Sequence, residues 1–249
     1  MVVQAQEGRL TTSRTRVLVA TAVPAERDAV ARALPGTGRE LRLPGVTLHR
    51  TGEAYDLLAA GVGPALAAAS VSAALTAAAL SGDPYGLVVS TGIAGGFAPA
   101  APVGSLVLAD EITAADLGAE TADGFLPVTE LGFGAVTHRP PESLVRETAA
   151  ATGALTGVVL TVSTVTGSAA RATVLRALHP RALAEAMEGF GVAEAAAAHG
   201  VPVLEIRAVS NPVGPRDRDA WRIGAALAAL TTAFGKLTPV LESWNPHDR

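Results

Sequence analysis

Short runs of apolar, often β-branched residues alternate along the chain with longer segments in which apolar residues recur at helical spacing. The runs at residues 16–21 and 86–91 are apolar almost throughout, as expected of strands buried on both faces. Pro24 follows the first run and marks a helix start, because proline is tolerated in a first helical turn. The alternation predicts an α/β fold, with a central mixed, mostly parallel twisted sheet flanked by helices on both sides.

The predicted elements follow one another without an internal repeat, a low-complexity linker or a break in composition. We expect a glycine-rich turn after residue 91 and a polar, glycine-punctuated stretch that reaches about residue 138. The sequence therefore predicts one domain over residues 16–244, preceded by a flexible extension over residues 1–15. Strands are predicted at residues 16–21, 46–50, 55–60, 86–91, 105–109, 157–162 and 201–210, and helices from Pro24 and at 64–80, 142–151, 168–178, 188–199 and 217–244.

The composition is that of an apolar globular protein. Of the 249 residues, 49% are hydrophobic, 17% charged and only 4% aromatic, so the core must be built from alanine, valine and leucine. A disordered chain would be more polar. The formal net charge of -4 gives no electrostatic footprint for nucleic acid or an anionic membrane. Residues 64–80 are the most apolar run, but they are rich in alanine and serine, which favours a buried helix over a membrane span.

Several kinds of chemistry are excluded by residue types and spacing. The chain has no cysteine, which excludes disulfides, thiolate metal sites and cysteine nucleophiles and fits a cytoplasmic location. Its 5 histidines are scattered without metal-ligand spacing, and no serine lies in an esterase G-x-S-x-G motif. We expect a soluble protein with no metal and no cofactor, and with neither nucleic acid nor a membrane as partner.

Polar and glycine-rich segments follow the predicted strands at residues 21–26, 91–96 and 210–217. Open α/β sheets bind ligands at the carboxyl ends of their strands, so these three segments predict one composite site. The glycines after Thr91 would let the backbone approach a ligand closely. Their spacing is not that of a dinucleotide-binding fingerprint, and taken alone the segment is more simply a structural turn.

Two further motifs each allow a structural and a functional interpretation. Glu188 stands at a predicted helix start, where the helix dipole stabilises a carboxylate. Alternatively, its two oxygens accept hydrogen bonds from a vicinal diol while Met187 packs on a sugar face. Strand alternation puts Arg207 and Asn211 on one face of the last strand. An arginine in so apolar a strand needs a carboxylate partner. Glu205 is a candidate for this partner, and its role would then be purely structural.

Together and in this order, these segments resemble the nucleoside phosphorylase superfamily, and especially its methylthioadenosine/S-adenosylhomocysteine nucleosidases. The resemblance covers residues 16–241 and includes the early glutamate, the TGIAGG segment, the MEG segment and the RAVSN strand end. The segments at residues 115–120, 124–127, 161–167 and 210–217 look like those of the futalosine hydrolase family in particular.

The resemblance implies a role for individual residues. It makes Glu26 the base that activates water, Arg207 a residue that helps to hold that water, and Asn211 the contact to the purine at N7. It also implies a homo-oligomer, a dimer or larger. The substrate-binding residues that it implies are Ile93, Ala94, Gly95, Thr164, Val165, Met187 and Glu188.

Asn211 departs from the nucleosidases, in which an aspartate contacts adenine. The oxygen O6 of a 6-oxopurine needs a donor and a protonated N7 needs an acceptor, and one amide supplies both. A mismatched polar group there costs about 1–3 kcal/mol. Hydrogen-bond polarity therefore favours hypoxanthine or guanine over adenine as the leaving base. Futalosine, an inosine-like nucleoside with a benzoate-containing 5′ group, carries hypoxanthine and agrees with this preference.

A benzoate needs a cation, and Arg216 and Arg218 follow Asn211 in a glycine/proline loop. Solvated loop charges are an equal alternative for both arginines. Trp221 could supply an aromatic wall, although an anchor for the last helix is the simpler interpretation.

The expected activity is hydrolysis of the N-ribosidic bond of futalosine, which releases hypoxanthine and dehypoxanthine futalosine in menaquinone biosynthesis. Glu26 would repel a phosphate nucleophile and Ile93 removes a hydroxyl from the glycine segment, so water is favoured over phosphate. The alternatives are another purine nucleosidase or phosphorylase acting on inosine-like or methylthioadenosine-like nucleosides, and a non-catalytic nucleoside-binding protein.

Overall fold

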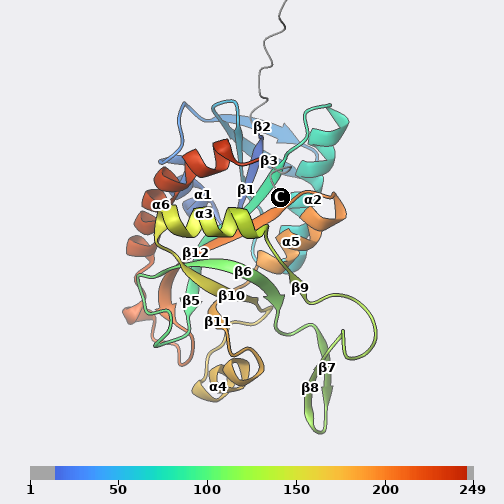
Figure 1. The fold of residues 1–249 in the computed structure, drawn as a ribbon, viewed down its shortest axis with the longest axis vertical. Helices are drawn as coiled ribbons and strands as arrows, with labels where there is room; N and C mark the ends of the chain where they lie inside the picture. The colour runs from blue at the N-terminus through green and yellow to red at the C-terminus, as the bar shows by residue number, and fades with distance from the viewer. Residues whose placement is uncertain (1–14, 246–249) are drawn as a thin grey trace, which may run out of the picture.

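The computed structural model describes residues 15–245, in which one mixed sheet is flanked by helices on both sides (Figure 1). The predicted α/β fold is confirmed. The predicted extension over residues 1–15 lies outside the described residues except for Thr15. The strands of the sheet are β1 (Val17–Thr21), β2 (Arg39–Leu43), β3 (Val46–Thr51), β4 (Tyr55–Ala59), β5 (Leu87–Gly96), β6 (Leu106–Ala114), β9 (Thr137–His138), β10 (Leu155–Thr161), β11 (Ala182–Ala186) and β12 (Val203–Pro212).

Helices cover the two faces of the sheet and bury separate apolar clusters against it. Helices α2 and α5 pack together on one face, where Val71 and Val192 join the core. Helices α1, α3 and α6 pack on the other face around Leu144 and Phe234. Both clusters consist mainly of alanine, valine and leucine, as the composition requires. The helices are α1 (Pro24–Ala31), α2 (Pro64–Leu80), α3 (Glu142–Thr152), α4 (Ala169–Leu178), α5 (Gly189–Ala198) and α6 (Ile223–Ser243).

The sheet is open at one end and closes on itself at the other. Its strand order is β11-β10-β6-β12-β5-β1-β4-β3-β2, with β9 beside β6. In addition, β11 pairs with β5 in antiparallel orientation, so that β5, β12, β6, β10 and β11 form a closed ring of pairings. The central pairings of β5 with β1 and β12 are parallel. The carboxyl ends of these three strands therefore meet at one edge, beside the ring.

The glycine-rich segment after Thr91 forms a strand, so the prediction of a turn there is wrong. Strand β5 continues to Gly96, because β12 pairs with it along one side and β11 along the other. The strands on both sides supply hydrogen-bond partners for the backbone of this segment, and a turn would leave those backbone groups without them. A β-carbon at Gly96 would come within 2.1 Å of the carbonyl oxygen of Ala101, so this position requires glycine for packing.

The end of the chain also differs from the prediction of one helix over residues 217–244. A short 3-10 helix, η1 (Arg218–Ala220), comes first, and Trp221 and Arg222 separate it from α6. The side chain of Asp217 caps η1, and the backbone N–H of Arg222 donates to the carbonyl of Ser210 at 2.8 Å. These contacts tie the loop to the end of β12 and break the helix. Strand β11, which the sequence did not predict, precedes α5.

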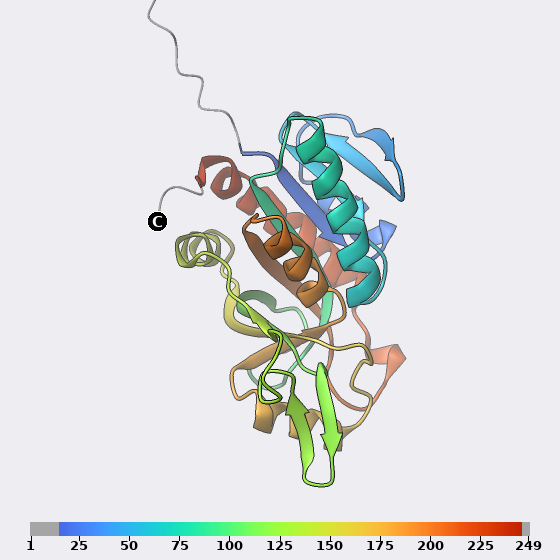
Figure 2. The same ribbon diagram turned by 90° about the vertical axis from the view of Figure 1, so that its right-hand side faces the viewer.

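Two other features of the outside of the molecule are relevant to partners. Strands β7 (Gly118–Thr121) and β8 (Gly124–Pro127) form a hairpin that projects from the body (Figure 2). Within the described residues, one helical stretch at 218–243 is long and apolar enough to cross a membrane, by length and composition alone. That is weak evidence for a span, since core helices pass the same test, and Leu230 and Phe234 of this stretch are fully buried in the protein.

Candidate active site

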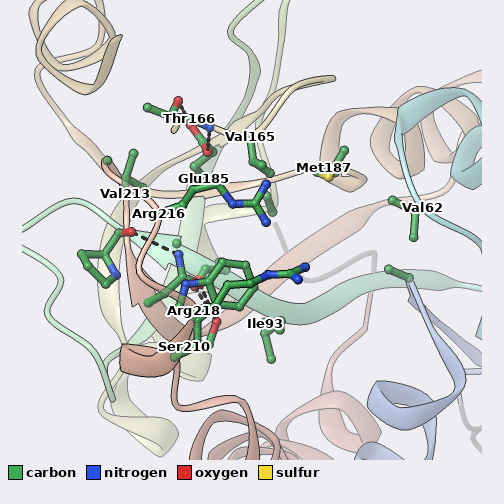
Figure 3. Close-up of a pocket in the computed structure, with 18 of the residues that line it drawn as sticks. Val62, Ile93, Val165, Thr166, Glu185, Met187, Ser210, Val213, Arg216 and Arg218 are labelled. Carbon is green, nitrogen blue, oxygen red and sulfur yellow. Dashed lines mark hydrogen bonds between the residues drawn. The ribbon is translucent and has the colours of Figure 1, made fainter. Parts of the chain in front are cut away.

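A cavity of about 620 Å³ lies at the carboxyl ends of β1, β5 and β12, within the usual size range of small-molecule sites (Figure 3). Its wall contains both Glu26 and Asn211, which the sequence places 185 positions apart (211 − 26). All but two of the predicted site residues line it. Those that do are Glu26, Ile93, Ala94, Gly95, Val165, Met187, Glu188, Asn211, Arg216 and Arg218.

The carboxylate of Glu26 is held in place by backbone N–H groups. Glu26 lies in the first turn of α1 and is 4% exposed. Its Oε2 accepts from the N–H groups of Ala22 at 3.0 Å and Val23 at 3.2 Å, and its Oε1 accepts from Ile93 at 2.8 Å. A carboxylate has about four acceptor sites, so one remains for a water molecule in the cavity. The loop after β1 and strand β5 thus fix this group from two sides.

Arg207 lies behind the wall of the cavity and is not part of its lining. It is 1% exposed, its Nε donates to Oε1 of Glu205 at 2.8 Å, and its Nη2 donates to Ser90 at 3.0 Å. Its Nη1 is 3.6 Å from Oε2 of Glu188. Burial would lower the pKa of Arg207, but the charges of Glu205, Glu188 and Glu26 raise it above the ordinary value. The expected carboxylate partner is confirmed, and Arg207 can act on the cavity only through the carboxylates in front of it.

Glu188 and Met187 both line the cavity at the junction of β11 and α5. Glu188 is 6% exposed, and its Oε1 accepts from the N–H of Gly63 at 3.2 Å. Its Oε2 faces Arg207, so each oxygen has one protein partner and retains capacity for a ligand hydroxyl. The position of this carboxylate inside the cavity favours the diol-binding interpretation over a purely helix-capping one.

Asn211 enters the cavity because of a bulge in β12. The pairing register with β5 shifts between Val209 and Asn211, so strand alternation does not extend from Arg207 to Asn211 as predicted. The Oδ1 of Asn211 accepts from the hydroxyl of Ser210 at 2.8 Å, and its Nδ2 donates to the carbonyl of Pro212 at 3.1 Å. The amide keeps one N–H and one lone pair for a ligand.

The loop after β10 supplies two cavity residues, one of which the sequence missed. Val165 and Thr166 line the cavity, whereas the predicted Thr164 is exposed and does not. Thr166 is held by Glu185 of β11, which accepts from its N–H at 2.7 Å and also from its hydroxyl. Glu185 lines the cavity as well and was not predicted. A lone charge in the apolar segment ALAEA was the signal that could have identified it.

A cationic, aromatic group lies beside Asn211. Arg216, Arg218 and Trp221 all line the cavity, and both guanidinium groups lie over the indole ring, at 5.6 Å and 6.0 Å from its centroid. Among residues 15–245 neither arginine has a carboxylate within 4.0 Å. Trp221 precedes α6 and faces the cavity, which favours the aromatic-wall interpretation. In the part of the chain that the structure describes, no cluster of three histidine, aspartate or glutamate side chains has the geometry of a metal site.

Known proteins with similar sequences show the family of this chain, and a solved structure shows the same fold. A family model described as the phosphorylase superfamily matches residues 16–240. The chain is 77% identical to a futalosine hydrolase of Streptomyces coelicolor, over 94% of this chain and 99% of that protein. It is 46% identical to a futalosine hydrolase of Acidothermus cellulolyticus, over 88% of this chain and 89% of that one. Its fold is similar to that of a methylthioadenosine/S-adenosylhomocysteine nucleosidase of Colwellia psychrerythraea solved with adenine, with a TM-score of 0.76, 20% identity, and 92% and 95% of the two chains covered.

Proposed function

The chain belongs to the phosphorylase superfamily, in its futalosine hydrolase family, and on this premise we propose that it hydrolyses the N-ribosidic bond of futalosine. The products are hypoxanthine and dehypoxanthine futalosine, and the reaction serves menaquinone biosynthesis. The observation that carries the proposal is that a fixed carboxylate, Glu26, and a neutral amide, Asn211, line the same cavity.

Glu26 is the general base. It takes a proton from water as the water oxygen bonds to C1′ of the ribose, while the bond from C1′ to N9 breaks and its electron pair leaves with the base. A positioned base of this kind contributes about 10²–10⁴-fold to the rate. The three N–H groups that hold the carboxylate keep it fixed on the wall, so no reorganisation is needed during the attack.

Glu188 binds the ribose hydroxyls, and Met187 packs on the sugar. Holding the ring in this way aligns C1′ with the water that Glu26 activates. Arg207 is a positioning residue in this proposal, because its guanidinium lies behind Glu188 and beside Glu26. Its positive charge offsets the negative charges of both nearby carboxylates.

Asn211 binds the leaving base at its N7/O6 edge, donating to O6 and accepting from a protonated N7. Ile93, Ala94 and Gly95 of β5 form the wall along which the nucleoside lies, and Val165 covers the base. Thr164, expected beside the purine, is outside the cavity lining, and its neighbour Thr166 takes its place in this proposal.

Arg216 and Arg218 bind the benzoate of the 5′ group, and Trp221 packs against its ring. Their positions on one wall, both guanidinium groups over the indole, support this assignment. A planar carboxylate is well matched to the donor fork of an arginine.

Assay of a nucleoside panel tests the proposed function. The panel consists of futalosine, aminodeoxyfutalosine, inosine and methylthioadenosine in phosphate-free buffer, with released hypoxanthine or adenine measured. We expect hypoxanthine release from futalosine without phosphate. A strict need for phosphate would refute hydrolysis. Tight binding of an inosine analogue without any turnover of the panel would refute catalytic activity and favour a nucleoside-binding protein.

The oligomeric state and location are parts of the same proposal. We place the protein in the cytoplasm as a homo-oligomer, a dimer or larger. Exposed apolar side chains of the kind found at interfaces support the assembly, with Val62 and Leu66 each 55% and Phe133 62% exposed. Light scattering on the purified chain should give a mass at least twice the 25.0 kDa of one chain.

A further inference from the structure

Glu205 is a buried carboxylate that the reaction described above does not use. It lies in β12, is 0% exposed, and stands outside the lining of the cavity. Its Oε1 accepts from Nε of Arg207 at 2.8 Å, while its Oε2 has no hydrogen-bond partner among the described residues. Burial raises the pKa of Glu205 above the ordinary value, although the charge and the hydrogen bond of Arg207 lower it. Apolar residues of the same shape often stabilise a core as well as such a pair does, so stability alone does not explain it.

Glu205 and Ser90 hold the guanidinium group of Arg207 from one side. Glu205 and Arg207 share one face of β12, and Ser90 of β5 is the pairing partner of Glu205. Nε of Arg207 donates to Glu205 at 2.8 Å, and Nη2 donates to Ser90 at 3.0 Å. Gly92 is the pairing partner of Arg207, and a β-carbon on it would be 3.0 Å from Nη1, so glycine leaves room for this nitrogen. Nε and Nη2 are therefore tethered, and Nη1 is left to face the carboxylates of the cavity wall.

This tether keeps Arg207 from forming a hydrogen bond to Glu188. Nη1 is 3.6 Å from Oε2 of Glu188, which is longer than the N–H···O distance of about 2.7–3.2 Å. At this distance the guanidinium offsets the negative charge of Glu188 but occupies none of its acceptor positions. Oε2 therefore keeps its lone pairs for a ligand hydroxyl. A guanidinium released from Glu205 would close the gap, because opposite charges attract strongly inside a protein.

Glu205 also packs against the main chain next to Glu188. A β-carbon on Gly189, the first residue of α5, would be 2.2 Å from Oε1 and 2.3 Å from Oε2 of Glu205. The carboxylate thus lies directly on the backbone at the point from which Glu188 enters the cavity. Glu205 therefore contacts both the guanidinium group and the chain segment that place Glu188.

On the basis of the proposed function, we infer that Glu205 is a positioning residue for ribose binding. It holds Arg207 at a distance from Glu188 at which both oxygens of Glu188 keep the capacity to accept from the 2′- and 3′-hydroxyls. Arg207 then acts on Glu188 through its charge alone. Loss of the tether lets Nη1 bond to Oε2 of Glu188, and the ribose diol loses one acceptor.

The variant Glu205→Met tests this role, because methionine is unbranched and fills similar space but cannot accept from Nε of Arg207. The readout is the ratio of the inhibition constants of 2′,3′-dideoxyinosine and inosine, each in competition with futalosine, since these nucleosides differ only in the ribose hydroxyls. We expect the wild type to bind inosine at least about tenfold more tightly. In Glu205→Met the ratio should fall by about tenfold, because inosine binding weakens and dideoxyinosine binding does not.

Two further variants test the tether independently. Glu205→Gln keeps an acceptor for Nε of Arg207, so it should keep the wild-type ratio within about threefold. Ser90→Ala removes only the neutral bond to Nη2 and should lower the ratio by about twofold or more. Because it changes no charge, Ser90→Ala also serves as the test if Glu205→Met does not fold.

Asp56→Asn is the matched control, because it breaks another buried carboxylate–arginine pair outside the lining of the cavity. It should lose stability but keep the wild-type ratio. If Glu205 only stabilises the fold, Glu205→Met will weaken the binding of both nucleosides equally, and that result overturns the inference. Unchanged ratios in Glu205→Met and Ser90→Ala, with hypoxanthine still released from futalosine by the wild type, overturn the inference alone. No hypoxanthine release by the wild type overturns the proposed function with it.

Discussion

Gly92 lies so close to Glu26 that a β-carbon on the glycine would be 2.6 Å from Oε1 of the carboxylate. The same β-carbon would be 3.0 Å from Nη1 of Arg207. The α-carbon of Gly92 is thus the place where the carboxylate in the cavity and the guanidinium behind it come together. Any side chain at this position must push one of them away.

Gly92→Ala should therefore lower kcat for futalosine hydrolysis by about 100-fold, the cost of a displacement of about 1 Å in a catalytic group. Gly235→Ala is the control, because Gly235 is exposed in the middle of α6 and a β-carbon on it would have no atom within 4 Å beyond its chain neighbours and the backbone of its own helix. That variant should keep full activity and gain about 0.5–1 kcal/mol in stability from helix propensity. Equal activity of the two variants would contradict the packing argument.

Glu26→Gln should lower kcat by about 10²–10⁴-fold, because an amide cannot take the proton of the attacking water. Glutamine can still accept from the N–H of Ile93, so the fold and hypoxanthine binding should be retained. Single-turnover rates and the inhibition constant of hypoxanthine measure the two effects separately. Near wild-type turnover in this variant would remove Glu26 from its proposed role.

Asn211→Asp should reverse part of the base preference. An aspartate sets an acceptor against O6, which needs a donor, and this costs about 1–3 kcal/mol with a 6-oxopurine, or about 10- to 100-fold in kcat/KM. The amino group of adenine can donate to the new carboxylate, so activity on aminodeoxyfutalosine should fall less. The ratio of released hypoxanthine to adenine in a mixed-substrate assay reports the change, and a constant ratio would refute the amide argument.

Arg216→Ala and Arg218→Ala should raise KM for futalosine while they leave KM for inosine unchanged, because inosine has no benzoate. Loss of a charged hydrogen bond of this kind corresponds to about 10-fold or more in affinity. Arg146→Ala is the control, since Arg146 is an exposed residue of α3 outside the cavity lining. If neither cavity variant changes KM for futalosine, the benzoate contacts another part of the wall.

Asp56→Asn should lower the free energy of unfolding by about 3 kcal/mol at pH 7, because it leaves two partly buried arginines without their buried carboxylate. Asp56 is 1% exposed and accepts from Arg50 at 2.9 Å and from Arg16 and Tyr85. Burial would raise the pKa of Asp56, but the bonds from Arg50 and Tyr85 and the charges of both arginines lower it below its ordinary value of 3.8.

The lowered pKa of Asp56 also determines how the difference in stability between wild type and Asp56→Asn depends on pH. Ionised Asp56 stabilises the fold above pH 3.8, and the contribution is lost as the pH falls further and the folded carboxyl protonates. The stability gap between wild type and Asp56→Asn should therefore shrink below pH 3.8 in denaturant titrations. Asp28→Asn, at an exposed pair with Arg27, should differ from wild type by less than about 1 kcal/mol throughout.

The sequence determined the fold class, most helices and strands, and most of the cavity residues. These features depend on local patterns: apolar periodicity, the proline that starts α1 and α2, and polar or glycine residues at strand ends. Helix α2 begins at Pro64 and ends at Leu80, the limits that the apolar run predicts. Residue type and resemblance are enough to identify Asn211 and Glu26 as site residues, and both line the cavity.

Only the tertiary structure decided how the remaining side chains lie relative to the cavity. The bulge before Asn211, the continuation of β5 to Gly96 and the pairing of β11 with β5 depend on partner strands that are remote in sequence. Those pairings put Glu185 into the cavity, and the packing of the strands leaves Arg207 behind its wall. Hydrogen bonds between distant strands fix the register, and a shift of one residue moves a side chain to the opposite face, which no local pattern in the sequence encodes.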